Sequence, residues 1–166
     1  INNSQQVDHI NQARWQWEQT TNAFCPYDYF TEGLKNKYYG MLRSHDGQEL
    51  QDKSCGSPSH DIAGTASGGW FQGDSTDKSG KWLEIGNQNG KAELLIRNSG
   101  AHEFSIRDYS PKILPEKLTV GNSTCYSESG KWAFARLDDD TSLSLAKGEG
   151  DCPSAFPKTS VETWER

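Results

Sequence analysis

The sequence predicts a mainly β fold, an antiparallel barrel or sandwich of about eight strands with one or two N-terminal helices. From about Ser67 onward, apolar and polar residues alternate with a period of two. The chain also contains 16 glycines, many of them in turn dipeptides such as Asn89-Gly90. Its 166 residues suit a single domain, in which we expect a helical lead, residues 1–50, to pack on a β domain, residues 67–166.

The helical lead carries two amphipathic patterns. The first repeats at three- and four-residue spacing and comprises Val7, Ile10, Ala13, Arg14 and Trp17. Cys25-Pro26 is expected to end this helix, because proline cannot continue it. A second helix is predicted to begin after Thr31 as N-cap, with Glu32 in its first turn, and to end near His45. Its apolar face comprises Leu34, Tyr38, Met41 and Leu42.

The β domain is predicted to contain eight or nine strands. They are expected near residues 68–73, 81–86, 91–97, 102–109, 117–120, 124–127, 131–137, 141–146 and 160–165. Alternation is clearest where Phe104 and Ile106 share one face and where Leu143 and Leu145 share another. Residues 87–90, with the sequence NQNG, are expected to form a hairpin turn.

The four cysteines indicate the compartment. They are Cys25, Cys55, Cys125 and Cys152, and their even number and wide spacing favour two disulfides over a zinc or redox motif. Three pairings are possible. We favour Cys25 with Cys55 and Cys125 with Cys152, because each bond then closes a sequence-local loop. Disulfides indicate an extracytoplasmic protein, secreted or periplasmic, whereas four buried reduced thiols remain the alternative.

Charge and hydropathy limit the partners. The formal net charge of −6, with no basic cluster, argues against sequence-independent binding to nucleic acid. No apolar run reaches the length of a membrane-spanning helix. Residues 1–6 lack the regions of a signal peptide, so the chain is expected to be a mature or trimmed product. No cofactor is expected, and no motif fixes the oligomeric state.

Aromatic residues supply the candidate binding site. The chain has 6 Trp, 6 Tyr and 6 Phe, and the motif Ser-Gly-x-Trp occurs three times, ending at Trp70, Trp82 and Trp132. These rings are either core anchors at the starts of strands or flat faces that stack on a ligand. On the second interpretation, the chain binds a small molecule or glycan in an aromatic-lined pocket. The candidate ligand-binding residues are Trp82, Trp132, Tyr126 and Arg136.

The strand pattern predicts different surroundings for two of these tryptophans. Leu83 and Ile85 give their strand an aliphatic face, so Trp82 should lie on the opposite, more exposed face. Trp132 shares its face with Phe134, and we expect that face to meet the leucines of the following strand and to be buried.

An enzyme is the first alternative. The tripeptide Ser-His-Asp occurs at residues 44–46 and 59–61, so His60 and Asp61 are candidate catalytic residues of a small hydrolase or lyase. A strand carboxylate such as Glu84 or Glu103 could replace Asp61 as the acid-base partner of His60. Turn chemistry explains the repeats equally well.

Metal binding and assembly are further alternatives. Three histidines, His45, His60 and His102, have no ligand spacing, so no metal site is expected. The acidic run at residues 138–140 suits a hairpin turn before it suits a calcium loop. An adhesion or assembly module would instead use exposed aromatics and strand edges to meet another protein.

The segment Gly68-Gly69-Trp70-Phe71, preceded by a helical lead, resembles the G-x-W signature of lipocalin- and avidin-type barrels. The resemblance implies that Trp70 plugs the base of a barrel. It also implies a basic residue of a late strand packed on this tryptophan, for which Arg166 and Arg136 are the candidates.

Overall fold

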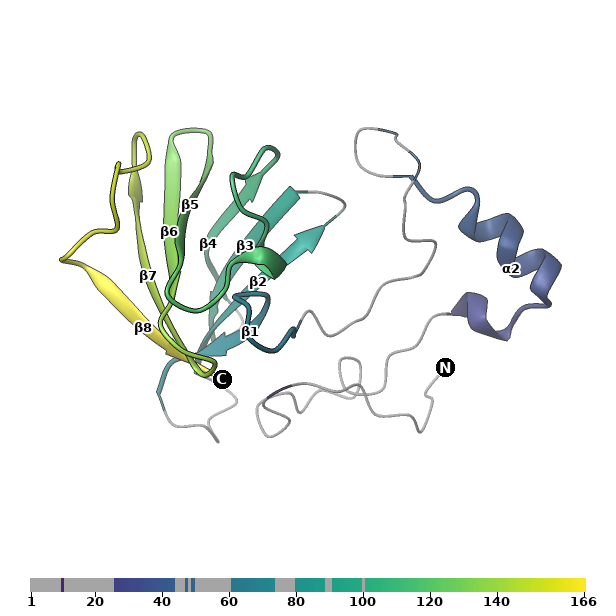
Figure 1. The fold of residues 1–166 in the computed structure, drawn as a ribbon, viewed down its shortest axis with the longest axis horizontal. Helices are drawn as coiled ribbons and strands as arrows, with labels where there is room; N and C mark the ends of the chain where they lie inside the picture. Colours follow the sequence, from purple (N-terminus) through teal and green to yellow (C-terminus); the bar gives the residue numbers. More distant parts are fainter. Residues whose placement is uncertain are drawn as a thin grey trace.

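The computed structural model describes residues 10, 26–43, 47, 49, 61–73, 80–88, 91–99 and 101–166 (Figure 1). The helical elements are the 3-10 turns η1 (Pro26–Tyr29) and η2 (Pro115–Lys117) and the α-helix α2 (Glu32–Tyr39). The strands are β1 (Gly68–Phe71), β2 (Lys81–Gln88), β3 (Lys91–Asn98), β4 (Ala101–Asp108), β5 (Ser123–Glu128), β6 (Lys131–Leu137), β7 (Ser142–Glu149) and β8 (Val161–Glu165). The predicted mainly β fold is confirmed.

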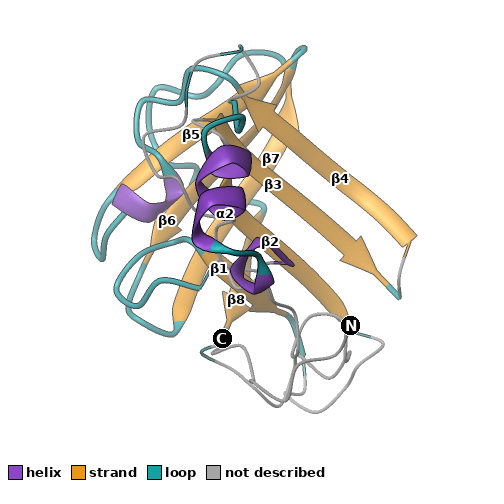
Figure 2. Cartoon of the chain, turned by 90° about the vertical axis from the view of Figure 1, so that its right-hand side faces the viewer, coloured by secondary structure: helices purple, strands orange, loops and turns teal. Residues whose placement is uncertain are grey.

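All eight strands form one antiparallel sheet in the order β4-β3-β2-β1-β8-β7-β6-β5. Six of the seven pairings join consecutive strands, and the seventh joins β1 to β8 through Phe71 and Glu165. The sheet curves so that its two halves face each other (Figures 1 and 2). It does not close into a barrel, because no backbone ladder joins the edge strands β4 and β5.

Side chains connect the two edge strands instead. The backbone N–H of Arg107 on β4 donates to Glu128 Oε2 at 2.9 Å, and the N–H of Ser127 on β5 donates to Asp108 Oδ2 at 3.1 Å. Each edge strand therefore contributes one carboxylate to a backbone donor of the other.

The core lies between the two halves of the curved sheet. On β6, Ala133, Ala135 and Leu137 point inward and are fully buried, whereas Trp132 and Arg136 on the other face are half-buried. The small alanines leave room for larger interior rings from other strands. The largest fully buried side chains are Trp70, Trp164, Tyr126, Leu83, Ile85, Leu94, Ile96, Ile106, Leu118, Leu137, Leu143 and Leu145.

One predicted strand, residues 117–120, is wrong. Pro115 lacks an N–H and has a fixed φ, which suits the start of the 3-10 turn η2. The N–H of Leu118 then bonds back to Leu114 O and Pro115 O, and Thr119 makes only an isolated bridge with Thr65. The predicted hairpin between β2 and β3 is confirmed by the pairing of the strands that flank it, while residues 89–90 lie outside the described residues.

Helix α2 begins after Thr31, as predicted, but ends at Tyr39, with Gly40 as C-cap, before the expected stop near His45. The predicted apolar face is largely exposed, since Leu34, Tyr38 and Met41 all count among the exposed apolar residues. Tyr39 is the buried residue instead. Apart from Ile10, the first predicted helix lies outside the described residues, and so does most of the segment joining α2 to the sheet. The packing of the lead on the β domain therefore stays a prediction.

Candidate functional site

Four residues, Trp70, Arg166, Asp61 and Gly68, form what we call the Trp70 cluster. It lies where β1, the first strand in the chain, meets the end of β8, the last one. Trp70 is fully buried, and its Nε1 donates to Ala66 O at 3.0 Å. The guanidinium carbon of Arg166 lies 4.2 Å from the centre of the Trp70 ring. Arg166 therefore takes the position that the G-x-W resemblance implies for a basic residue.

The Arg166 guanidinium also holds three backbone carbonyls. It donates to Asp140 O at 2.9 Å, Ser67 O at 3.1 Å and Thr65 O at 3.0 Å. Burial lowers the pKa of Arg166, although the charges of Asp61 and Asp140 act in the opposite direction. Two segments of the chain, residues 65–67 and the turn at Asp140, are thus tied to one side chain.

Asp61 bonds to the backbone at the start of β1. Its Oδ1 accepts the N–H of Gly69 at 2.7 Å, and its Oδ2 accepts the N–H of Ile10 at 2.8 Å. Gly68 has a φ of 139°, and a Cβ there would lie 2.2 Å from Asp61 Oδ1, so only glycine fits. Asp61 thus binds backbone, while its predicted catalytic partner His60 lies outside the described residues. The catalytic pair stays a prediction.

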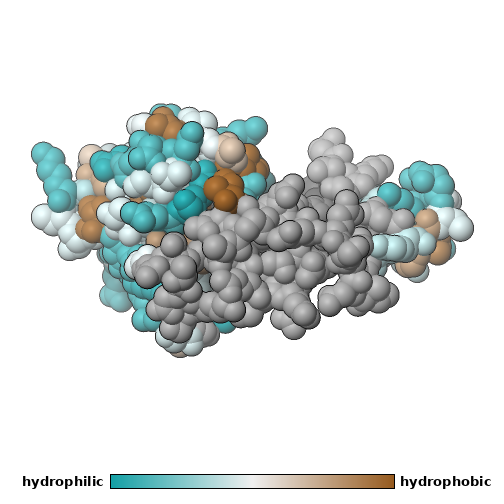
Figure 3. Space-filling model, turned by 90° about the horizontal axis from the view of Figure 1, so that it is seen from below, coloured by the Kyte–Doolittle hydropathy of each residue, from teal (hydrophilic) through white to brown (hydrophobic). Residues whose placement is uncertain are grey.

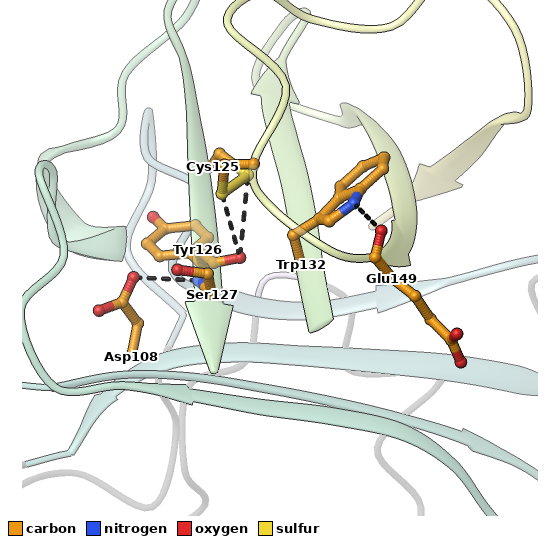
Figure 4. Close-up of a disulfide and its surroundings, with 7 residues drawn as sticks. Asp108, Cys125, Tyr126, Ser127, Trp132 and Glu149 are labelled. Atoms are coloured by element: carbon orange, nitrogen blue, oxygen red, sulfur yellow. Dashed lines mark hydrogen bonds between the residues drawn. A yellow bond between two sulfur atoms is a disulfide. The ribbon is translucent and has the colours of Figure 1, made fainter. Parts of the chain in front are cut away.

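Trp132 and Arg136 lie on the outer face of β6, covered in part by the segment that precedes β8. Trp132 Nε1 donates to Glu149 O at 3.1 Å (Figure 4). The Arg136 guanidinium lies 4.5 Å from the ring centre of Phe156 and donates to Asp138 Oδ1 at 2.6 Å. Arg136 is therefore not the residue that packs on Trp70.

The predicted burial of Trp132 against the next strand is wrong. In the observed register Leu143 pairs with Leu137 and Leu145 with Ala135, so both leucines face the core together with the small side chains of β6. Trp132 instead lies over Gly148, where an added Cβ would be 2.6 Å from the ring.

The disulfide Cys125–Cys152 is present and ties β5 to the segment after β7 (Figure 4). This confirms the second of the two predicted pairings. Cys25 and Cys55 lie outside the described residues, so their pairing stays a prediction.

Trp82 lies on the face of β2 opposite Leu83 and Ile85, as predicted, and is half-buried, with the Arg97 guanidinium 5.8 Å from its ring centre. In the sheet order, β2 is four strands away from β6. The structure therefore places Trp82 apart from Trp132, and both of them on a different face from Tyr126, which points into the core.

Tyr126 lies in an interior site of which the candidate residues predicted from the sequence include only this tyrosine. The residue is fully buried, and its hydroxyl has no hydrogen-bond partner among the described residues. Burial raises the pKa of Tyr126, and the nearby carboxylates of Glu116 and Asp108 raise it further. Burial and two carboxylates thus both disfavour the ionised form of the Tyr126 hydroxyl.

The neighbours of Tyr126 come from three other elements. Glu116 on η2 accepts the side-chain N–H of Asn87 at Oε1, at 2.8 Å, while its Oε2 is buried and has no partner in the described part of the chain. Asp108 at the end of β4 accepts the N–H of Ser110 at 2.9 Å. It also accepts the N–H of Ser127 at 3.1 Å (Figure 4). We call Tyr126, Glu116, Asp108 and Asn87 the Tyr126 site.

A signal for part of this site was present in the sequence. The period of two that places Phe104 and Ile106 on one face also places Asp108 on that face, where it bonds to Ser127 of β5. No periodicity predicts Glu116, because it lies in a turn outside the sheet.

A charged cluster of two lysines and two glutamates also spans the sheet. Glu103 Oε1 lies 2.9 Å from Lys81 Nζ and 3.1 Å from Lys147 Nζ. Glu162 Oε1 lies 3.4 Å from Lys81 Nζ and 2.7 Å from Lys147 Nζ. The hydrogen bond from Lys81 lowers the pKa of Glu103, so this carboxylate is a weak base and a poor fit for the acid-base role considered for it.

Metal ligands and membrane spans are not apparent in the parts of the chain that the structure describes. No group of three His, Cys, Asp or Glu side chains converges there, and no helix there is long and apolar enough to cross a membrane. In the acidic run, Asp139 Oδ1 accepts the N–H of Thr141 at 2.8 Å, which is the geometry of the expected hairpin turn.

Two surface features concern the predicted ligand pocket and the alternative of an adhesion or assembly module. A hollow of about 550 Å³ is lined by Pro111, Lys112, Ile113, Leu114, Lys117 and Asn122, and none of the predicted ligand-binding residues belongs to it. The face of the sheet region seen in Figure 3 is mostly hydrophilic, with separate small apolar spots.

Comparisons with known proteins add no further identification. A scan against family models gives no match, and neither the curated proteins nor the solved structures contain a match to this chain.

Proposed function

We propose that this chain is an extracytoplasmic binding protein for a small molecule or glycan, and that the Tyr126 site holds the polar part of the ligand. One observation carries the proposal: the buried Tyr126 hydroxyl and the buried Glu116 Oε2 both lack partners among the described residues. Each buried polar atom without a hydrogen bond lowers the stability of the folded protein by roughly 1–3 kcal/mol. A ligand that bonds to both atoms removes this cost, and the free energy recovered contributes to its affinity.

The surrounding contacts favour a prepared site over a random packing defect. Asp108 is fixed by two backbone N–H groups, and Asn87 fixes the other carboxylate oxygen of Glu116. Hydrogen bonds of this kind hold a binding group in position before the ligand arrives.

The location outside the cytoplasm is supported by the disulfide Cys125–Cys152, since such bonds persist in oxidising compartments. The aromatic rings first considered as a joint ligand platform lie on separate surfaces. Of the four predicted ligand-binding residues, the proposal therefore keeps Tyr126.

A binding screen on matched tyrosine variants tests the proposal. Methyl glycosides, aliphatic diols, alkylamines and carboxylates are screened by thermal shift, and hits are measured by calorimetry. A hit should bind the unmodified protein and Tyr109→Phe, whose ring is exposed, but bind Tyr126→Phe at least about tenfold more weakly, since a buried polar group loses its partner. Equal binding to Tyr126→Phe, or no hit in any class, overturns the proposal.

A further inference from the structure

We infer that the ligand of the Tyr126 site carries a cationic hydrogen-bond donor, namely a primary ammonium or a similarly small organic cation. This inference rests on the proposed function and names the chemical class of the ligand. It follows from the charges that face the site and from the atoms that remain available within it.

Among the described residues, the carboxylates of Glu116 and Asp108 add to the effect of burial and raise the pKa of the Tyr126 hydroxyl. Glu116 Oε2 is itself buried and has no hydrogen-bond partner in that part of the chain. The basic side chains of the neighbouring segments are engaged elsewhere: Arg107 Nε donates to Glu93 Oε1 at 2.9 Å, and Lys91 Nζ lies 5.6 Å from the ring centre of Tyr109. Lys117, beside Glu116 on η2, is exposed and lines the surface hollow. Among the described residues, no ion pair joins a basic side chain to Glu116 or Asp108.

Hydrogen bonding alone admits two kinds of ligand group. Glu116 Oε2 can only accept, and Tyr126 Oη can accept or donate. A neutral hydroxyl could bridge them by accepting from Tyr126 and donating to Glu116. An ammonium could bridge them by donating to both, because it has three N–H donors.

Charge decides between these two groups. A buried carboxylate without a cationic partner is costly, and a charge-assisted bond is about twice as strong as a neutral one. A hydroxyl leaves the charge of Glu116 uncompensated, whereas an ammonium neutralises it. An anionic group would add a third negative charge beside Glu116 and Asp108, so carboxylates and phosphates are excluded by the same argument.

The position of Glu116 explains how a ligand group can be admitted. Three of the four residues in the site belong to strands, but Glu116 belongs to the three-residue turn η2. Turns of this kind hold few internal hydrogen bonds and move more readily than ladder residues. We therefore expect a ligand to be accommodated by a small displacement of η2, with β4 and β5 unchanged.

A titration with three probes of equal chain length tests the inference. Propylammonium, 1-propanol and propionate are each titrated at pH 7, and binding is followed through the amide resonances of Ser110 and Ser127, which bond to Asp108. The test variant is Glu116→Gln, which removes the charge and keeps the shape. The control is Glu165→Gln, which removes an exposed carboxylate of β8.

The unmodified protein and Glu165→Gln should bind propylammonium about tenfold more tightly than 1-propanol and should not respond to propionate. In Glu116→Gln this preference should fall to about twofold or less, with the affinity for 1-propanol unchanged. Melting temperatures show whether each variant is folded. Because Glu116 is on a turn at the margin of the core, Glu116→Gln should stay folded.

The possible failures are separable. Equal affinity for propylammonium and 1-propanol, both lost in Tyr126→Phe, overturns the cation inference and leaves the proposed binding function standing. A preference for propylammonium that survives in Glu116→Gln also overturns the inference. No binding by any probe, with water alone occupying the site, overturns both.

Discussion

The Trp70 cluster and the Tyr126 site differ in whether their buried polar groups form hydrogen bonds. In the Trp70 cluster the indole N–H, the guanidinium and the Asp61 carboxylate all bond to backbone atoms. In the Tyr126 site the phenol and one carboxylate oxygen are buried without such bonds. Satisfied networks stabilise a fold, whereas unsatisfied ones cost stability and are retained where function needs them. The difference separates a structural region from a candidate binding region within one core.

The largest expected effect is the loss of the Trp70 ring. Trp70→Ala should lower the free energy of unfolding by about 3–5 kcal/mol, because it empties a fully buried volume and removes the surface on which Arg166 packs. Urea denaturation measures this change. The control is Trp82→Ala, where the half-buried ring should cost clearly less. Similar losses in the two variants would contradict the assignment of Trp70 as the structural anchor.

Removal of the guanidinium should have the next largest effect. Arg166→Leu leaves the carbonyls of Thr65, Ser67 and Asp140 without their donor, which should cost about 2–3 kcal/mol. Arg136→Leu removes a half-buried pair with Asp138 and should cost under about 1 kcal/mol. Chemical denaturation of both variants under one set of conditions measures the two losses in the free energy of unfolding. Equal losses would contradict the structural difference between the two arginines.

In the Tyr126 site, removal of a buried polar group should increase the free energy of unfolding, whereas it decreases it in the Trp70 cluster. Tyr126→Phe removes a buried hydroxyl that has no partner, so the free energy of unfolding of the ligand-free protein should rise by about 1 kcal/mol. Tyr109→Phe changes an exposed ring and should have no measurable effect. A decrease in stability on Tyr126→Phe would mean that the hydroxyl is already satisfied, and the contrast with the Trp70 cluster would disappear.

The charged cluster should give the smallest effect, and one that depends on pH. Because the pKa of Glu103 is lowered in the folded state, its stabilisation is present above its ordinary pKa of 4.5 and is lost as the pH falls below it. Glu103 is one-third exposed, so solvent screening limits this contribution to under about 1 kcal/mol. Unfolding curves of the unmodified protein and Glu103→Gln should therefore differ slightly at pH 7 and converge as the pH falls through the lowered pKa of Glu103. A constant difference would show that the ion pairs do not contribute.

Much of the fold could be predicted from local patterns. Alternation and turn residues identified the strands. The G-x-W segment implied a basic partner for Trp70 with Arg166 and Arg136 as candidates, of which the structure shows Arg166. The segment at 117–120 failed because the proline at 115 starts a turn that no period of two reveals. Helix α2 was too long in the prediction, since apolar spacing continued past its actual end.

The site was harder to predict because alternation gives two faces but does not say which one is buried. On β6 the bulky face with Trp132 was expected inside, whereas the small face is inside, because Trp164 and Tyr126 from other strands fill the space in front of the alanines. The bulky face is covered by Phe156, whose position depends on the later segment. Glu116 depends on how η2 packs near β2, which a single sequence does not encode in any local pattern.

The open seam between β4 and β5 affects how copies of this protein meet in solution. Exposed strand edges offer unpaired N–H groups to any foreign strand, which makes them starting points for aggregation. Here Glu128 occupies the N–H of Arg107, and Asp108 occupies the N–H of Ser127. A second chain that approached this seam would have to displace both carboxylates before it could form a ladder. The open sheet is thereby protected against growth at its edges without being closed.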